Sequence, residues 1–334
     1  MNLQEIAKMA NVSSATVSNA LSNKSGVSDK TREKIIKIAN ENGYKQYGRM
    51  KSANLFGNIR FLKYQDTDLI IDESTEYISE IIEETELALR LQGFNLLMTS
   101  YLNKNNFEEI FLMMRKTLPQ GVILLGSELC PDISEELLKF NIPLVVIDNS
   151  MPYYNINCVQ PNNKEITMDA IKYLSSRGYK TIGHIRSRFQ INKFKERNEG
   201  FRQGLLSNNL PYFPGYEFMV TPTVSDSCNE LESIFLETPL LPNVFFCDSD
   251  NIAIGAIKAL QKLGYKVPKD VSIMGFGDLP SSAIFDPTLT TMKVDMLEIA
   301  KLAVQLLLDN INSKKNNIAK IQVSAQLIVR NSTK

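Results

Sequence analysis

Short apolar runs alternate with longer amphipathic patterns along most of the chain, from residue 57 onward. The apolar runs have the length of buried β-strands and fall at 57–64, 94–99, 121–125, 144–148, 181–186, 243–247 and 271–275. The amphipathic segments have helical periodicity and fall at about 75–92, 105–116, 133–140, 163–177, 193–208, 226–237, 250–263 and 295–312. Strands that alternate with helices form parallel sheets with helices on both faces, so we predict an α/β fold here.

The composition excludes several kinds of chemistry. The sequence has one histidine, His184, so a zinc or iron site built from several histidines is excluded. The cysteines are scattered and form no C-x-x-C pair: Cys130, Cys158, Cys228 and Cys247. No G-x-G-x-x-G loop, P-loop or nucleophile elbow is present. We therefore expect neither a metal nor a cofactor, and no enzymatic activity.

The first residues, MNLQEIAKMA, lack the charged segment and apolar run of an export signal. No uncharged apolar stretch reaches the roughly 18 residues that span a bilayer. Scattered cysteines without export signals are typical of reduced thiols. We expect a cytoplasmic protein that does not enter a membrane.

The balanced charge of 37 basic and 37 acidic side chains conceals two unlike parts. Residues 1–51 hold nine basic and four acidic groups, a net charge of +5, which leaves −5 on the remainder of the chain. A basic end on an acidic body indicates a polyanion-binding segment, although such an end can also be plain solvated surface.

Three short helices can be predicted in the basic segment. Asn2 is placed to cap the first, with Glu5 three residues later, and Ser13 and Ser28 are placed to cap the second and third. Two short helices joined by a tight turn match a helix-turn-helix, whose second helix enters the major groove of DNA. The exposed face of this second helix carries small hydroxyls and one amide, which suit phosphates and an adenine edge. The alternative is that they only cap and solvate a short helix.

The string LQEIAKMANVSSATVSNALSNKSGVSDKTREKIIKIANENGYK resembles the DNA-binding headpiece of the LacI/GalR (lactose-repressor) family of transcription regulators. The resemblance implies that three residues contact base edges: Ser14, Ala15 and Asn19. It implies that six others contact the DNA backbone: Ser13, Thr16, Ser18, Ser22, Thr31 and Tyr44. Members commonly carry Arg where Asn19 stands. Because Arg favours guanine and Asn favours adenine, the operator should differ at that base pair.

The segment after the headpiece departs from the family pattern, which implies a hinge helix with a leucine wedged into the minor groove. Here Ala53 stands at the leucine position, and Gly48 lowers helix propensity. Arg49 can still contact phosphate or a narrow minor groove, and Met50 can replace the wedge. The alternative is a basic flexible linker.

The rest of the chain also resembles this family, in the strings GVILLGS, IPLVVIDN, YLSSRGYKTIGHI, ERNEGFRQGL, PTLTTMKVDM and LIVRNST. The resemblance implies a core similar to periplasmic binding proteins, with two Rossmann-like lobes and a ligand in the cleft at the ends of the strands. We therefore predict a three-helix headpiece at 1–45, a hinge at 46–56 and an effector-binding, dimerising core of two interleaved lobes at 57–334.

Candidate effector-binding residues follow from the same resemblance. Arg197 matches the arginine of an R-x-x-G motif, and Ser249 with Asp250 match the N-D pair before A-x-G-A. Asp148 closes the strand LVVID, and Tyr77 matches the first aromatic residue of an N-P-F-F stretch. For Asp148 and Tyr77, the alternatives are helix capping and surface packing.

Two departures concern charge in this cleft. Gly277 stands where members have an aspartate, and the first core strand carries Arg60 and Lys63. Lys63 lies near the cleft end of that strand, so we include it among the candidate effector ligands. Further cations end or follow another strand: Arg186, Arg188 and Lys193. These cations suggest an anionic effector, such as a phosphorylated sugar. The alternative is that Arg60 and Lys63 pair with acids in 66–86.

These features predict a sequence-specific DNA-binding regulator, most simply a repressor of a carbohydrate-related operon. It would bind a palindromic operator on double-stranded DNA as a homodimer, under control of a small-molecule effector. The alternatives are a sugar-binding receptor without a transcriptional role and a nucleotide-dependent α/β enzyme.

Overall fold

The computed structural model describes residues 3–21, 27–28, 31–32, 34–35, 38–39, 57–65, 75–101, 107–129, 137, 139, 141–313 and 318–334. The chain divides into two compact units, residues 1–53 and 54–334.

In the first unit, helices α1 (Leu3–Ala10) and α2 (Ser14–Leu21) are joined by a turn at Asn11, whose φ of 58° is left-handed. The apolar residues of both helices form one small core with those of a later helical segment: Ile6, Ala7, Ala10, Val17, Ala20, Ile35 and Ala39. Arg32 donates to the carbonyl of Ala20 at 2.8 Å, and Lys34 donates to the carbonyl of Ala10 at 3.0 Å. These cations satisfy carbonyls at the ends of α1 and α2, where helices leave them without partners.

The first lobe of the second unit is a six-stranded parallel sheet in the order β11-β5-β4-β3-β1-β2. Its strands are β1 (Gly57–Tyr64), β2 (Phe94–Tyr101), β3 (Gly121–Leu125), β4 (Leu144–Ile147), β5 (Asn157–Pro161) and β11 (Lys320–Val323). Helices α5 (Thr75–Leu91) and α13 (Met296–Asn312) pack on the face that carries Ile59 and Phe61. Helix α6 (Phe107–Thr117) packs on the face that carries Leu62 and Tyr64.

The second lobe has the order β12-β10-β9-β8-β6-β7, with β12 antiparallel to its neighbour. Its strands are β6 (Ile182–Ser187), β7 (Glu217–Val220), β8 (Val244–Cys247), β9 (Ser272–Gly277), β10 (Thr290–Val294) and β12 (Ala325–Ile328). Its helices are α8 (Asn163–Ser176), α9 (Asn192–Ser207), η1 (Pro214–Tyr216), α10 (Val224–Glu237), α11 (Asp250–Lys262) and α12 (Pro280–Ile284).

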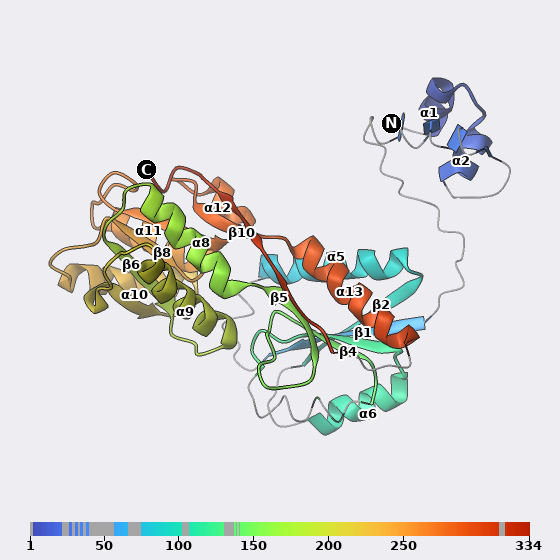
Figure 1. Ribbon diagram of the computed structural model, residues 1–334, viewed down its shortest axis with the longest axis horizontal. Helices are drawn as coiled ribbons and strands as arrows, with labels where there is room; N and C mark the ends of the chain where they lie inside the picture. Colours follow the sequence, from blue (N-terminus) through green and yellow to red (C-terminus); the bar gives the residue numbers. More distant parts are fainter. Residues whose placement is uncertain are drawn as a thin grey trace. The chain divides into compact units, whose positions relative to one another are not determined.

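The chain passes between the lobes three times, after β5, after β10 and between β11 and β12. Helices α8 and α13 follow the first two passages and lie in different lobes (Figure 1). Each lobe is therefore assembled from segments far apart in the sequence.

The predicted α/β class and its parallel sheets are confirmed, and all seven predicted strands are present. The part of the chain that the structure describes contains five further strands that were not predicted: β5, β7, β10, β11 and β12. Strand β5 carries Asn157 and Gln160 and ends in a proline, and β7, β11 and β12 are edge or alternating strands. None of these presents the continuous apolar run of a central parallel strand. In the predicted 133–140 helix, only residues 137 and 139 lie within the described residues, and residue 137 is helical.

Candidate DNA-binding and effector sites

Helix α2 turns a polar face away from the small core of the first unit. Ser13 precedes this helix, and its Oγ accepts the backbone N–H of Thr16 at 3.1 Å, the expected capping bond. Ser14 and Ser18 are exposed and Asn19 is half-buried, whereas Val17 and Ala20 are buried. The capped helix therefore presents hydroxyls and one amide on a single side.

Thr31 lies in the later helical segment, where its N–H and hydroxyl bond Ser28 at 3.4 and 2.8 Å. Four other predicted DNA contacts lie outside the described residues: Ser22, Tyr44, Arg49 and Met50. The side chain of Ala15 also lies outside them, as does the predicted hinge at 46–56.

Five of the six predicted effector residues line one cavity of about 70 Å³ between the two lobes: Tyr77, Asp148, Arg197, Ser249 and Asp250. Lys63 is not among the residues that line it. Lys193 and Gly277, which the sequence singled out for the charge of the cleft, also line it. The other lining residues were not predicted: Pro161, Phe194, Pro222, Asn251, Phe276, Leu279, Val294 and Met296. The cavity lies at the carboxyl ends of β4, β8 and β9, where open α/β sheets bind their ligands.

Asp148 contributes a buried carboxylate from the first lobe, directly after β4. Its backbone has a φ of 63°, and its Oδ2 accepts from Ser127 at 2.5 Å and from Lys193 at 2.8 Å. Burial raises the pKa of Asp148, but the ammonium of Lys193 and the bonds from Lys193 and Ser127 outweigh burial, so the pKa lies below its usual value. Asp148 is therefore an ionised acceptor.

Lys193 comes from the second lobe, in the first turn of α9, and its ion pair with Asp148 joins the lobes. Its Nζ also lies 5.5 Å from the ring centroid of Tyr77, within cation–π range. Next to this pair, Asn192 donates to Asn149 at 3.0 Å, again from the second lobe to the first. Lys193 stands four residues before Arg197, and this helical spacing places both side chains on one side of α9.

Tyr77 closes the same corner of the cavity from α5. Its hydroxyl hydrogen-bonds Asp148, and burial together with that carboxylate raises the pKa of Tyr77 well above its usual value. The phenol is therefore a neutral donor beside an ionised acceptor.

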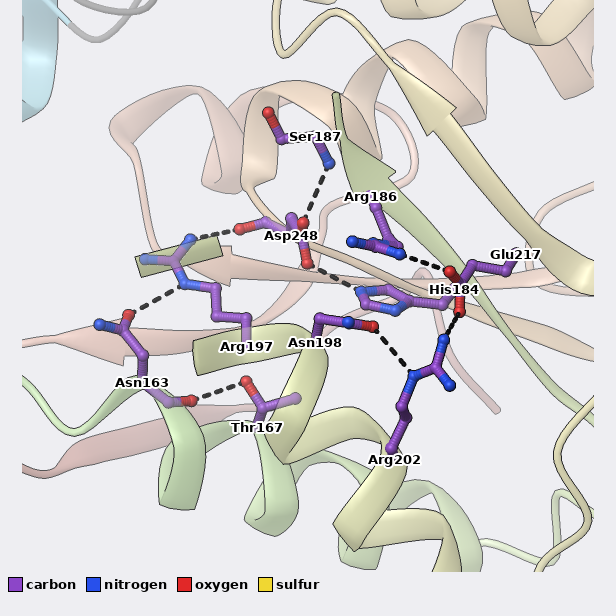
Figure 2. A network of polar contacts seen from close by, with 10 residues as sticks. All are labelled: Asn163, Thr167, His184, Arg186, Ser187, Arg197, Asn198, Arg202, Glu217 and Asp248. Atoms are coloured by element: carbon purple, nitrogen blue, oxygen red, sulfur yellow. Dashed lines mark hydrogen bonds and ion pairs between the residues drawn. The ribbon is translucent and has the colours of Figure 1, made fainter. Parts of the chain in front are cut away.

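Arg197 is a buried cation held by neutral acceptors (Figure 2). Its Nε donates to Asn163 Oδ1 at 3.0 Å, and its Nη1 donates to the carbonyl of Asp248. The guanidinium lies 3.7 Å from the ring centroid of Phe276. Burial lowers the pKa of Arg197, and nearby carboxylates, Asp248 and Asp148 first, oppose that effect. A stacked guanidinium facing a cavity is suited to polar ligand atoms.

Ser249 and Asp250 form the wall of the cavity in the second lobe, and their side-chain oxygens accept hydrogen bonds from other residues of the protein. Ser249 Oγ caps α11 by accepting from Ile252 N at 3.3 Å. Asp250 Oδ1 accepts from Thr291 at 2.6 Å, and Oδ2 accepts from Ser282 and the Leu279 amide, both at 2.8 Å. Burial raises the pKa of Asp250 despite these bonds.

Gly277 faces Asp250 across this wall and has a φ of 135°. L-residues rarely adopt that conformation, so an aspartate with this backbone would be strained. The glycine at this position is therefore explained by backbone conformation.

Of the four cations predicted near the cleft, Lys193 lines the cavity, and Lys63, Arg186 and Arg188 do not. Arg186 pairs with Glu217 at 2.5 Å and Arg188 with Glu230 at 2.8 Å, both away from the cavity lining. The lining holds two cations, Lys193 and Arg197, and two carboxylates, Asp148 and Asp250.

Arg60, on the first strand, has a partner other than the acids in 66–86. Arg60 donates to Thr99 at 2.7 Å, which gives this buried cation a neutral acceptor on β2. Asp66, Asp68, Asp72 and Glu73 lie outside the described residues.

Two segments of the chain match known families. Residues 2–46 match the family described as bacterial regulatory proteins, lacI family, and residues 171–333 match a periplasmic binding protein-like domain. Among the helices of the described residues, none has the length and apolar character needed to cross a membrane.

Several solved structures have the same fold. The transcriptional regulator CelR in complex with cellobiose aligns with a TM-score of 0.74 at 20% identity, covering 99% of both chains. The lac repressor dimer bound to operator and the anti-inducer ONPF aligns with a TM-score of 0.71 at 20% identity, covering 100% of this chain and 99% of that one. A LacI-family regulator from Enterococcus faecium with bound ribose has a TM-score of 0.68 at 21% identity, covering 83% and 98%.

Curated relatives are similar over nearly their whole length. The HTH-type transcriptional repressor CytR of Escherichia coli (strain K12) is 31% identical, over 99% of this chain and 96% of that one. The HTH-type transcriptional repressor PurR of Pasteurella multocida (strain Pm70) is 28% identical, over 99% and 98%. The probable HTH-type transcriptional repressor ExuR of Bacillus subtilis (strain 168) is 27% identical, over 100% and 98%. With its helix-turn-helix unit and two-lobed core, the chain therefore belongs to the LacI family of DNA-binding bacterial transcription regulators.

Proposed function

We propose that the protein is a repressor that binds a palindromic operator as a homodimer and that a small molecule in the cleft between the lobes controls it. The convergence of Asp148, Lys193 and Arg197 on one cavity, from both lobes, carries this proposal. A ligand there contacts both lobes, so its binding changes their closure and thereby the DNA-binding state. The relatives named as repressors and the operator-bound lac repressor dimer support the same assignment.

The effector is a neutral molecule with several hydroxyl groups. A hydroxyl donates to the carboxylate of Asp148 while a neighbouring one accepts from Lys193, so neither buried charge loses its partner. An anionic group pairs with Lys193 but leaves Asp148 uncompensated. Aromatic rings at Tyr77, Phe194 and Phe276 supply flat apolar walls for the carbon face of such a molecule.

The cavity is small for this ligand. A volume of about 70 Å³ holds a few water molecules, which is less space than a sugar ring needs. An effector of that size therefore displaces the Lys193 ammonium from Asp148 and moves the lobes apart at this point. Binding is thus coupled to the conformation of the core.

The effector is tested by thermal unfolding of the full chain with ribose, cellobiose and ribose 5-phosphate as probes. We expect neutral sugars to raise the melting temperature and the phosphorylated one to have less effect. Stabilisation by the phosphorylated sugar alone would contradict the neutral effector. A second experiment selects duplexes that bind the protein from a random DNA library. We expect it to enrich a palindrome, and the stabilising sugar should change the affinity for that palindrome. If no sequence is enriched, a sugar receptor without a transcriptional role is favoured.

The reading of bases is tested with Asn19→Arg. Because arginine bonds guanine bidentately and asparagine bonds adenine, we expect the selected operator to change at one base pair in each half-site. Met9→Arg is the matched control, since it adds the same charge to an exposed position on α1 and should leave the selected sequence unchanged. The same operator from Asn19→Arg and the unaltered protein would show that Asn19 does not contact a base.

A further inference from the structure

The single histidine of the sequence, His184, is buried in the second lobe next to the residue that holds Arg197. Its Nε2 lies 2.8 Å from Asp248 Oδ1, and its ring stacks on Phe201 at 4.3 Å between centroids. Its Nδ1 is buried without a hydrogen-bond partner. A proton on Nδ1 would be unsatisfied there, so the ring carries its proton on Nε2 and donates to Asp248.

Both the side chain and the backbone of Asp248 are hydrogen-bonded. Its Oδ1 accepts from His184, its Oδ2 accepts from the Ser187 amide at 2.9 Å, and its own N–H donates to Ile185 at 3.0 Å. Its carbonyl accepts from Arg197, and Ser249 and Asp250 of the cavity wall follow directly. Figure 2 shows this order of contacts from the imidazole through Asp248 to the guanidinium.

The other carboxylate beside the histidine has partners of its own. Glu217 lies opposite His184 in the β6–β7 register and binds Arg186 at 2.5 Å, Arg202 at 3.2 Å and Tyr212 at 2.8 Å. Asp248 and Glu217 are the carboxylates that the described contacts place beside the ring, and Arg186 and Arg202 bind Glu217 (Figure 2). Because Glu217 is engaged by these partners, the imidazole proton is directed to Asp248.

We infer that His184 is a positioning residue of the effector site. It fixes the carboxylate of Asp248, and the fixed turn at 248–250 presents to Arg197 the carbonyl that orients its guanidinium. This inference rests on the proposed role of Arg197 in effector binding, because His184 itself does not line the cavity.

The test compares His184→Gln with His184→Leu in the ligand-free full chain. Glutamine can place an amide donor near the position of Nε2, whereas leucine fills space and leaves Oδ1 of Asp248 without that donor. In protein labelled with ¹⁵N-arginine, the Nε–H signal of Arg197 is identified by its loss in Arg197→Lys. We expect the leucine variant to shift this signal and to speed its hydrogen exchange about tenfold, and the glutamine variant to restore it.

An Arg197 signal that stays unchanged in His184→Leu would overturn the inference. If that variant does not fold, the reverse measurement decides. With ¹⁵N-histidine, the chain gives one ring signal, because it has one histidine. Arg197→Met should shift this signal, while Arg177→Met, at a position that bonds the Lys334 carbonyl, should not. If Arg197→Met leaves the ring signal unchanged, the proposed coupling between His184 and Arg197 is refuted. No ligand is added, so these outcomes are independent of whether the cleft binds a sugar.

Discussion

At the scale of single residues, the cleft is defined by opposite charges brought together from two lobes. Asp148 and Lys193 are 45 positions apart and meet at 2.8 Å, with 3% and 12% of their side chains exposed. Removing one member of a buried pair leaves the other charge without compensation, which costs more than the pair contributes in total. The stability of the core should therefore respond sharply to changes here.

Lys193→Met is expected to lower the free energy of unfolding of the core by about 2–3 kcal/mol, because the buried carboxylate of Asp148 loses its ammonium partner. The loss is smaller than for a fully buried pair, because 12% of the Lys193 side chain is exposed. Urea unfolding followed by tyrosine fluorescence measures this change. Lys195→Met, at an exposed position on the same helix, should change the value by less than about 0.5 kcal/mol. Adding Asp148→Asn to Lys193→Met should recover much of the loss, and strict additivity of the two changes would contradict a direct pair.

The same pair gives the core a pH dependence. The pKa of Asp148 lies below its usual value of about 3.9. Its contribution to stability is therefore complete above that value and is lost as the pH falls through the lower folded pKa. Urea midpoints below about pH 4 should fall more steeply for the unaltered protein than for Asp148→Asn. Parallel pH profiles for the two proteins would argue against an ionised Asp148.

At the scale of elements, the fold was predictable where a strand is a continuous apolar run, as in Gly121–Leu125. It was not predictable where polar residues such as Gln160 lie in a strand, because their burial depends on partners from distant segments, here Glu196. The site divides in the same way. Arg197 was found by its motif and Lys193 by its charge just after a strand. The ion pair between Lys193 and Asp148 was not predicted, because no local pattern shows that the first turn of α9 reaches Asp148.

The seating of α9 on α8 holds Arg197 and depends on close approach at Gly200. A Cβ there would lie 2.3 Å from the carbonyl oxygen of Lys164 and 2.9 Å from Thr167 Cβ. Backbone atoms cannot yield cheaply, so Gly200→Ala should destabilise the core by about 1–3 kcal/mol, despite the higher helix propensity of alanine.

Gly215→Ala is the matched control for this change, because an added Cβ there meets nothing within 4 Å. Its urea midpoint should stay near that of the unaltered protein. Equal midpoints for the two alanine variants would mean that α8 and α9 can separate without loss of stability.

At the scale of the whole molecule, the two predicted functions are carried by parts of opposite charge, +5 for residues 1–51 and −5 for the rest. DNA binding by the basic part releases counterions, whereas binding of a neutral effector does not. The two equilibria should therefore respond differently to salt.

Raising the salt from 50 to 200 mM should weaken operator binding by at least about tenfold, as measured by fluorescence anisotropy. Over the same range, the affinity for a stabilising sugar, measured by titration calorimetry, should change by less than about twofold. A sugar affinity that falls as steeply as the operator affinity would show that the effector is charged.

The third passage between the lobes has a consequence for synthesis of the chain on the ribosome. Strands β11 and β12 lie at the edges of the two sheets, and Ser332 bonds the carbonyl of Ile273 at 2.6 Å, so both lobes are completed by residues 320–332. The helix-turn-helix is therefore synthesised before the core, while the two sheets that flank the cleft are complete only after residues 320–332 have been made. A nonsense codon shortly after residue 313 would leave every residue that lines the cavity in place, yet remove an edge strand from each sheet. We expect such a truncated protein to keep its DNA-binding segment and to lose its response to the effector.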